Sequence, residues 1–278
     1  MSEQVDAAEI ADVVRSYRLV AAGTRASGRL GAQRGRGPGS SLEFHDFRDY
    51  APGDDLRHVD WTSYARTDQL RVRLHEAEVA PLVEVLLDTS ASMAIRASKR
   101  SASLALVRAL LALARGAGSR GRALALHGGE LTTSELAGDE LRFDGPAGPP
   151  QPPQLALRPG SVRMLVSDAL WPSDAGALLR RLAGGASRLV VLQLLDPSEL
   201  RPEVGGAVTL VDCESGERRD LRLDEAALRE YEQRLQRHCS ALCEHVVRLG
   251  GSFASVGVDR LAVMCRRDLL PARIVEPA

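Results

Sequence analysis

The sequence predicts an α/β protein with a mostly parallel central sheet and helices on both of its faces. Nearly continuous apolar segments, such as "LVEVLLD" at 82–88, alternate along the chain with longer segments of helical periodicity. Strands that are apolar throughout are typical of parallel sheets, because helices cover both faces. The 278 residues are enough for one such domain and a smaller appended module.

The chain begins with a predicted helix and a predicted loop, which together form a first region at 1–41. Residues 4–22 carry apolar side chains at helical spacing. Residues 23–41 are rich in Gly, Arg and Ser, which predicts a flexible basic loop. Such a loop could contact nucleic acid or an acidic partner, but no aromatic side chains interleave for base stacking, so a solvated loop is favoured.

The second predicted region, 42–80, is a small β-rich module appended to the main domain. Pro52-Gly53 indicates a turn, and "QLRVRLHE" alternates apolar and charged residues as a half-buried strand does. We expect the charged residues between these segments to form helix caps and ion pairs rather than a second site, with Trp61 in the core. These charged residues are Asp54, Asp55, Arg57 and Asp60.

The third predicted region, 81–278, holds the α/β domain. The strand at 82–88 is followed by a predicted helix at 98–118 that ends at glycines. A hairpin about a Ser-Gly turn is expected at 207–223, and then a long amphipathic helix at 224–251 with Asp224 as its N-cap. The other strands are expected at 122–128, 162–168, 187–196 and 252–258, and the other helices at 173–185 and 259–270.

Composition and charge argue against several classes of protein. A formal net charge of −1 gives no bulk attraction to nucleic acid or to anionic membranes. No apolar stretch approaches the roughly 20 residues of a membrane span, and the acidic first residues do not resemble a secretory signal. The 4 cysteines fit reduced thiols better than a disulfide framework. We therefore expect a bacterial-type cytoplasmic protein with no nucleic-acid partner and no direct membrane span.

Three predicted strands end in an aspartate, namely Asp88, Asp168 and Asp196. In an open α/β sheet, ligands bind outside the carboxyl ends of the strands. Carboxylates gathered there repel one another unless a cation lies between them. Ser90 and Ser92 follow the first aspartate and add hydroxyl oxygens. Because carboxylates with hydroxyls suit a hard cation such as Mg²⁺, the sequence predicts a metal site at this edge.

The motif Asp88-Thr-Ser90-Ala-Ser92 resembles the Asp-x-Ser-x-Ser motif of von Willebrand factor A domains, where it forms the metal-ion-dependent adhesion site. "VSDA" at 166–169 resembles the second acidic element of that site. The resemblance implies a von Willebrand factor A-like (Rossmann-like) fold that binds Mg²⁺, with Mn²⁺ or Ca²⁺ as alternatives. The implied metal ligands are Asp88, Ser90, Ser92 and Asp168, with Asp196 as a supporting residue.

A longer resemblance covers most of the chain. The runs "YAPGDDLRHVDW" before the motif and "LLDPSELRP" after it are similar to the family called domain of unknown function 58. Members of that family are often encoded beside MoxR-type AAA+ ATPases. The resemblance implies a non-catalytic protein–protein interaction module that partners a MoxR-type AAA+ ATPase in a chaperone-like or complex-maturation role. The partner would place an acidic side chain on the metal.

The sequence departs from the adhesion-site pattern at one ligand. Such domains usually take a threonine from a Gly-Gly-Thr-like loop, and here Thr132 and Thr133 are the nearest candidates, although we expect them in a short hairpin. Losing this ligand would leave a weaker or differently shaped site. The alternative is an adaptor that binds through another surface and keeps a vestigial metal site. In it, Ser90 and Ser92 cap the following helix, and backbone N–H groups hold Asp88.

Enzymatic interpretations of the same stretch are less favoured, and a metal-dependent hydrolase is the more distant alternative. Haloacid-dehalogenase-like enzymes place a second acid two residues after the reacting aspartate, where this chain has Ser90. A serine hydrolase needs a nucleophile elbow and a histidine base, which the sequence does not display. We expect Cys239 and Cys243 to be core thiols flanked by the surface histidines His238 and His245, because zinc ligands must converge.

Overall fold

The computed structural model describes residues 2–20, 44–52, 59–75, 81–126, 130–137, 140–145, 157–171, 174–203 and 205–278. Its contacts divide the chain into a larger unit, Met1–Ala26 with Ala80–Ala278, and a smaller unit, Ser27–Val79. The basic loop predicted at 23–41 lies outside the described residues, and so do Asp54, Asp55 and Arg57.

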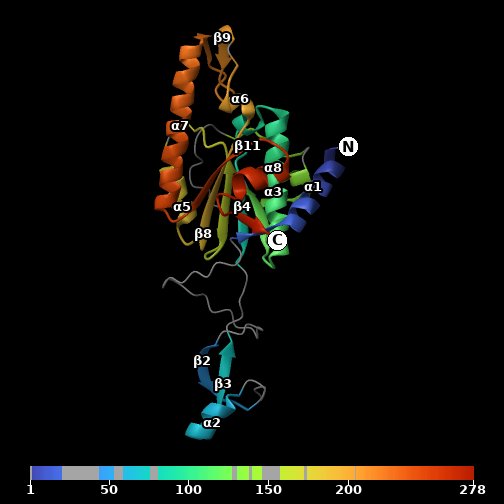
Figure 1. Cartoon of the computed structure of the whole chain (residues 1–278), viewed down its shortest axis with the longest axis vertical. Coiled ribbons are helices and arrows are strands. Elements are labelled where there is room, and N and C mark those ends of the chain that lie inside the picture. The colour runs from blue at the N-terminus through green and yellow to red at the C-terminus, as the bar shows by residue number, and fades with distance from the viewer. Residues whose placement is uncertain are drawn as a thin grey trace. The chain divides into compact units, whose positions relative to one another are not determined.

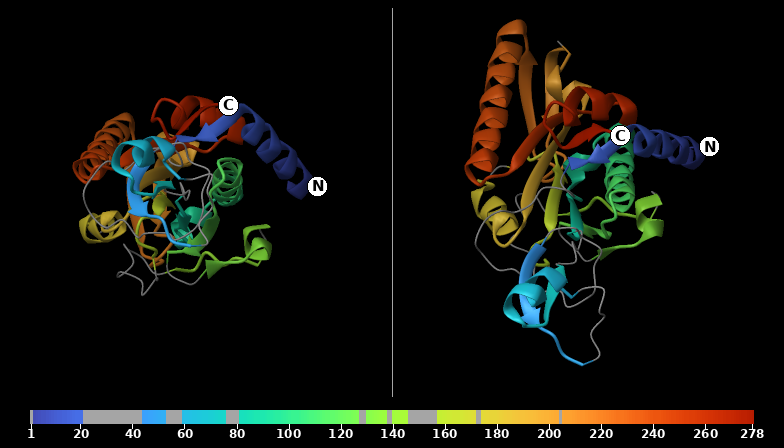
Figure 2. Two further views of the ribbon diagram at one scale, coloured as in Figure 1. Left: turned by 90° about the horizontal axis from the view of Figure 1, so that it is seen from below. Right: turned by 60° about the horizontal axis from the view of Figure 1, so that its bottom comes forward.

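The larger unit contains a six-stranded sheet with helices on both faces (Figures 1 and 2). The strand order is β11-β8-β7-β4-β5-β6, and all neighbours are parallel except the edge strand β6, which is antiparallel to β5. The predicted mostly parallel sheet is therefore confirmed. The strands are β4 (Val83–Leu87), β5 (Gly121–Ala125), β6 (Glu130–Leu131), β7 (Val162–Ser167), β8 (Arg188–Leu195) and β11 (Ser252–Gly257).

Two hydrophobic cores, one on each face, hold the helices to the sheet. The first core takes side chains from α1 (Ser2–Ser16), α3 (Ala97–Gly116) and α8 (Leu261–Met264), and the second from α5 (Gly176–Ala183) and α7 (Glu225–Arg248). Side chains of β4 alternate between them, since Val85 and Leu87 join the first core and Leu86 joins the second. The segment at 82–88 is therefore nearly all apolar because both of its faces are covered.

The order of the strands reverses at β4. The chain passes from β4 to β5 on one side and later returns to place β7 on the other side. The carboxyl ends of β4 and β7 are therefore the topological switch point of the sheet, where ligands bind in open α/β folds. Leu87 is paired with Val166, so Asp88 and Asp168 follow their strands at nearly the same level.

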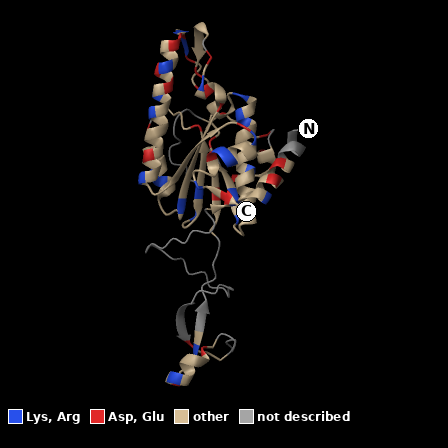
Figure 3. Cartoon of the chain, viewed as in Figure 1, with Lys and Arg blue, Asp and Glu red and all other residues tan. Residues whose placement is uncertain are grey.

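The segment from 206 to 270 follows the prediction closely. The hairpin consists of the antiparallel strands β9 (Gly206–Val211) and β10 (Arg218–Leu223). The Asp224 carboxylate caps α7 as predicted, because its Oδ1 accepts the Ala227 N–H at 2.9 Å. Basic and acidic residues follow one another along α7 (Figure 3). A π-helical turn, Cys265–Leu269, extends α8. None of the helices in the described ranges is both long and apolar enough to cross a membrane.

The N-terminal helix belongs to the larger unit, which differs from the predicted grouping of residues 1–41 as a separate region. Val13 of α1 is buried in the first core, and α1 packs on α3. The next strand, β1 (Tyr17–Leu19), pairs antiparallel with β12 (Val275–Pro277) near the other end of the chain. The apolar face of α1 therefore places the helix on the sheet domain rather than with the β-rich segment.

The smaller unit contains the antiparallel strands β2 (Phe44–Asp49) and β3 (Arg71–His75), and the helix α2 (Trp61–Thr67). Asp60 caps α2 as predicted, since its Oδ1 accepts the N–H groups of Thr62 at 3.0 Å and Ser63 at 3.1 Å. The prediction that Trp61 belongs to the core is wrong. Trp61 is 56% exposed, and no other residue of α2 is buried either. The Trp61 ring contacts the Tyr64 ring edge to face.

The cap of α7 gives a test of the fold. Replacing Asp224 by alanine leaves the Ala227 N–H without its acceptor, which should lower the free energy of unfolding by about 1 kcal/mol. Asp224→Asn retains a capping oxygen and should stay close to the wild type. Urea unfolding followed by circular dichroism measures both variants. Equal destabilisation of the alanine and asparagine variants would contradict the capping role.

Candidate functional site

Asp88 lies immediately after β4 and is fully buried. Its Oδ1 accepts the Ser90 N–H at 2.9 Å, and its Oδ2 accepts the Ser167 hydroxyl at 2.6 Å and the Trp171 indole N–H at 3.1 Å. Ser167 ends β7 and Trp171 follows it, so the neighbouring strand of the switch point orients this carboxylate. The structure therefore joins the two acidic segments that the sequence analysis placed at one edge of the sheet.

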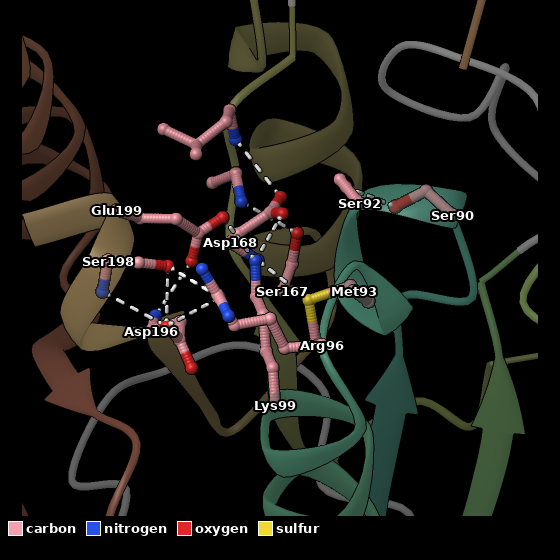
Figure 4. A network of polar contacts seen from close by, with 12 residues as sticks. Ser90, Ser92, Met93, Arg96, Lys99, Ser167, Asp168, Asp196, Ser198 and Glu199 are labelled. Atoms are coloured by element: carbon pink, nitrogen blue, oxygen red, sulfur yellow. Dashed lines mark hydrogen bonds and ion pairs between the residues drawn. The ribbon is translucent and has the colours of Figure 1, made fainter. Parts of the chain in front are cut away.

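The hydroxyls of Ser90 and Ser92 form a pair beside Asp88. Their Oγ atoms are 3.0 Å apart, and the two side chains lie next to each other in Figure 4. Ser90 is the N-cap residue of the short 3-10 helix η3 (Ala91–Ala94), yet its side chain makes no capping hydrogen bond. Ser90 therefore does not cap the helix as the alternative expects, although its backbone N–H does hold Asp88 as that alternative expects.

Asp168 is fully buried and forms an ion pair with a fully buried lysine (Figure 4). Lys99 Nζ of α3 donates to Asp168 Oδ2 at 2.9 Å and to Glu199 Oε1 at 2.7 Å. The Leu170 N–H donates to Asp168 Oδ1 at 3.2 Å. A cation supplied by the chain itself therefore offsets part of the repulsion expected among the acidic residues.

Asp196 lies at the start of α6 (Pro197–Leu200), where it forms a capping box. Its Oδ1 accepts the Ser198 N–H at 3.0 Å, and its own N–H donates to Glu199 Oε2 at 2.7 Å. The Ser98 hydroxyl donates to Asp196 Oδ2 at 3.1 Å. Burial opposes ionisation of Asp196, but the hydrogen bonds from Ser198 and Ser98 and the nearby Arg96 outweigh it, so the pKa of Asp196 is lowered. Asp196 reaches the rest of the site through Glu199.

The two threonine candidates make their contacts elsewhere. Thr132 follows the edge strand β6, and its hydroxyl donates to Glu135 Oε2 at 2.7 Å. Thr133 is the first residue of α4 (Thr133–Ala137). Gly145, in the described range 140–145, does pair with the motif, because its N–H donates to the Thr89 carbonyl oxygen at 3.0 Å.

Glu214 approaches the site from the turn between β9 and β10. Burial raises the pKa of Glu214, and repulsion from Asp168, Asp212 and Asp88 raises it further, whereas a hydrogen bond with the Ser92 side chain acts in the opposite direction. A carboxylate that lies far from this site in the sequence is therefore close enough to interact with three of the four predicted ligands.

Four residues near the site are not among the predicted ones, although two of them have a recognisable signal in the sequence. They are Lys99, Glu199, Trp171 and Glu214. Lys99 shares the buried face of α3 with Ala102 and Ser103, three and four residues later, and a lysine in such a position requires a buried partner. Glu199 stands three residues after Asp196, which is capping-box spacing. Trp171 and Glu214 carry no local signal, because only the tertiary fold brings them to the site.

Within the described ranges, no group of three or more His, Cys, Asp or Glu side chains could hold a metal ion. The predicted set differs from such a group, because it combines only two carboxylates with two serine hydroxyls. Cys239 and Cys243 are free and partly buried. The histidines beside them are half-buried rather than on the surface, since α7 packs on the loop after β7 and His238 Nε2 lies 2.8 Å from the Ala169 carbonyl oxygen.

Comparison with known proteins connects part of the chain to a family. Residues 46–134 match the family model "Protein of unknown function DUF58". The DUF58 match includes the Asp88–Ser92 motif and ends before Asp168, and over this range it confirms the resemblance seen in the sequence. A solved structure described as "Crystal structure of conserved hypothetical protein BatB from Bacteroides thetaiotaomicron" is similar at 13% identity and a TM-score of 0.28, over 62% of this chain and 99% of that chain. The search of curated proteins gave no match.

The buried ion pair gives a direct test of the site. Lys99→Ala leaves the buried Asp168 and the half-buried Glu199 without their counter-ion, which should lower the free energy of unfolding by about 3–5 kcal/mol. The control, Arg229→Ala, removes an exposed partner of Glu225 and should cost less than about 1 kcal/mol. Urea unfolding measures both. A loss for Lys99→Ala no larger than that of the control would contradict the proposed importance of the pair.

Proposed function

We propose that the carboxyl edge of β4 and β7 is a divalent-cation site of the metal-ion-dependent adhesion type in a von Willebrand factor A-like domain. In this proposal the protein is a non-catalytic interaction module, and its partner supplies an acidic side chain to the metal. The observation that carries the proposal is the pair of hydroxyls at Ser90 and Ser92, adjacent to a buried carboxylate at the switch point and, for Ser90, without a capping role.

The donor set fits a hard cation. Neighbouring ligands of an octahedral Mg²⁺ ion, with bonds of about 2.1 Å, lie about 3 Å apart. The Oγ atoms of Ser90 and Ser92 are 3.0 Å apart, which is compatible with that arrangement. Asp88 and Asp168 would hold the ion together with these hydroxyls, and Mn²⁺ or Ca²⁺ accepts the same types of ligand. A bound cation would attract a partner's carboxylate to its open coordination position.

The charge distribution also supports a bound cation. Lys99 is shared between Asp168 and Glu199, and both Asp168 and Asp88 act on Glu214, so the carboxylates at this edge outnumber the Lys99 ammonium group. Burial raises the pKa of Glu214, and repulsion from Asp168, Asp212 and Asp88 adds to that effect. A divalent ion would offset that repulsion.

Exposed apolar side chains on the same elements favour a protein partner. Ile95 follows η3, Leu170 follows Asp168 by two residues, and Leu200 ends α6. Leu210 and Val211 precede the turn that carries Glu214. These five side chains are between 37% and 55% exposed. Large apolar side chains exposed beside a polar site are typical of a surface that a partner covers.

The DUF58 resemblance supplies the partner in this proposal, which is a MoxR-type AAA+ ATPase. The role would be chaperone-like or in the maturation of a protein complex. An acidic side chain of the ATPase would reach the metal, while the surrounding apolar side chains would contact its surface.

Metal binding can be measured by calorimetric titration with Mg²⁺ and Mn²⁺. The wild type should bind one ion, and Asp88→Asn should lose most of the affinity because it removes a negative charge from the site. Ser92→Ala should weaken binding by removing one hydroxyl ligand. Asp12→Ala changes an exposed carboxylate of α1 and should bind like the wild type. Equal binding by the wild type and Asp88→Asn would exclude this metal site.

Partner binding can be measured with a purified MoxR-type ATPase in the presence of Mg²⁺ throughout, because chelation would also disturb the nucleotide site of the ATPase. The wild type should bind the ATPase, and Asp88→Asn should reduce the affinity at least about tenfold, a difference of about 1.4 kcal/mol. Asp12→Ala is again the matched control.

The alternative is an adaptor that binds through another surface and keeps a vestigial metal site. It is favoured by one observation, the ion pair in which Lys99 already compensates Asp168. Undiminished binding of the ATPase by Asp88→Asn would favour this alternative. A hydrolase is tested by a phosphatase and esterase substrate screen, and activity that Ser90→Ala abolishes would overturn the non-catalytic proposal.

A further inference from the structure

The residue after Asp168 has a strained backbone that hydrogen bonds hold in place. Ala169 has a φ of 52°, in the left-handed region that residues other than glycine seldom adopt. The Asp168 carbonyl oxygen accepts a hydrogen bond from Gln193 Nε2 of β8 at 3.0 Å. The Ala169 carbonyl oxygen accepts one from His238 Nε2 of α7 at 2.8 Å, since a carbonyl oxygen is an acceptor only. The orientation of Asp168 therefore depends on bonds from both β8 and α7.

A second hydrogen bond joins α7 to the other acidic loop. The Tyr231 hydroxyl donates to the Glu199 carbonyl oxygen of α6 at 2.5 Å. Tyr231 precedes His238 by about two helical turns, so the two side chains lie on one side of α7. Both are half-buried, whereas their neighbours Glu232 and Arg237 are exposed. One side of α7 therefore binds both loops.

These two bonds and the Lys99 ion pair form a closed ring of contacts. Lys99 Nζ bridges the carboxylates of Asp168 and Glu199 (Figure 4). Tyr231 binds the main chain of Glu199, and His238 binds the main chain of the residue after Asp168. Because α7 carries both Tyr231 and His238, it closes the ring. The two acidic loops cannot change their spacing without breaking or lengthening one of these bonds.

The later turns of α7 make it a rigid support for the ring. Leu242 and Val246 of α7 are buried, and both belong to the second core. Leu242 follows His238 by about one helical turn. The helix also contacts β8 and β11 of the sheet. Tyr231 and His238 therefore hold the two loops against an element that the core fixes in place.

We propose that Tyr231 and His238 are positioning residues of the candidate metal site, which they reach through the two acidic loops without touching the ion. This inference rests on the proposed function. Without the His238 bond, the strained backbone at Ala169 would relax, and the Asp168 carboxylate would lose the orientation in which it binds the ion. Metal binding would then be weaker.

The Tyr231 bond acts on the same carboxylate through Lys99. It holds Glu199 beside Lys99, so that the ammonium charge is shared between two acids. Without this bond, Glu199 would be freer to leave. The charge of Lys99 would then rest on Asp168 alone, where it competes with a bound cation for the same carboxylate. Loss of the Tyr231 hydroxyl would therefore also weaken metal binding.

Calorimetric titration of the full-length protein with Mn²⁺ tests both residues. Tyr231→Phe removes only a hydroxyl and His238→Ala removes the ring, and each should raise the Kd for Mn²⁺ about tenfold. His238→Gln offers an amide N–H to the same carbonyl oxygen and should restore most of the affinity. Arg234→Ala is the matched control on α7. It removes an exposed partner of Glu230 and should bind like the wild type.

The double variant, Tyr231→Phe with His238→Ala, tests the ring itself. Either substitution alone opens the ring, so the second should weaken binding less than the first. The Kd of the double variant should therefore rise by clearly less than the roughly hundredfold of two independent losses. A hundredfold rise would show that the two bonds act separately and would contradict the ring.

A purely structural role for these residues gives a different result. The variants would then unfold at lower urea concentrations but bind Mn²⁺ with the affinity of the wild type, and only this inference would fail. Binding by His238→Gln as weak as that of His238→Ala would contradict the role of the His238 hydrogen bond. If the wild type binds neither Mg²⁺ nor Mn²⁺ in the calorimeter, the proposed function fails, and this inference fails with it.

Discussion

The Lys99 ammonium, buried between Asp168 and Glu199, is the interaction on which the rest of the candidate site depends. It connects α3, the loop after β7 and α6, which are three separate segments at the carboxyl edge of the sheet. A buried lysine is costly unless its charge is paired, so this arrangement ties the positions of those segments to one another. Asp168 cannot move away from the sheet without leaving Lys99 short of a partner.

The same ion pair bears on metal binding. Lys99 donates to one carboxylate oxygen of Asp168, and the Leu170 N–H donates to the other. The orientation of the Asp168 side chain is therefore fixed. Asp88 is held as well, by Ser90, Ser167 and Trp171. A site with oriented carboxylates loses little conformational freedom when a ligand binds, which favours affinity. The pair of serine hydroxyls supports the proposed metal site over a purely structural role, because the described structure shows no capping bond from the Ser90 side chain.

Much of the fold could be predicted because its signals are local. The apolar segment at 82–88 and the cap at Asp224 each depend on a few consecutive residues, and both were recognised from the sequence. Asp88, Ser90 and Ser92 can be predicted as candidate ligands for the same reason, because they belong to one short motif. The prediction of Asp168 needs one further rule, which is that parallel strands present their carboxyl ends at the same edge of the sheet.

The residues that the sequence did not reveal depend on long-range packing. Trp171 donates to a carboxylate that lies 83 positions earlier in the chain. Glu214 lies in the turn of the β9–β10 hairpin. The sequence predicts this turn, but it does not predict which part of the domain the turn faces. The prediction for Trp61 is wrong because tryptophan side chains are highly buried on average, whereas α2 leaves all of its side chains at least partly exposed. Pairing across the fold, rather than local propensity, fixes these positions.

Anomalous X-ray diffraction from crystals grown with Mn²⁺ would locate the proposed ion. We expect an anomalous peak between Ser90, Ser92 and Asp168, at roughly 2.0–2.6 Å from both hydroxyl oxygens. Crystals that contain Mn²⁺ but show no peak there, with the Ser90 and Ser92 hydroxyls bonded only to protein groups, would contradict the proposed metal site.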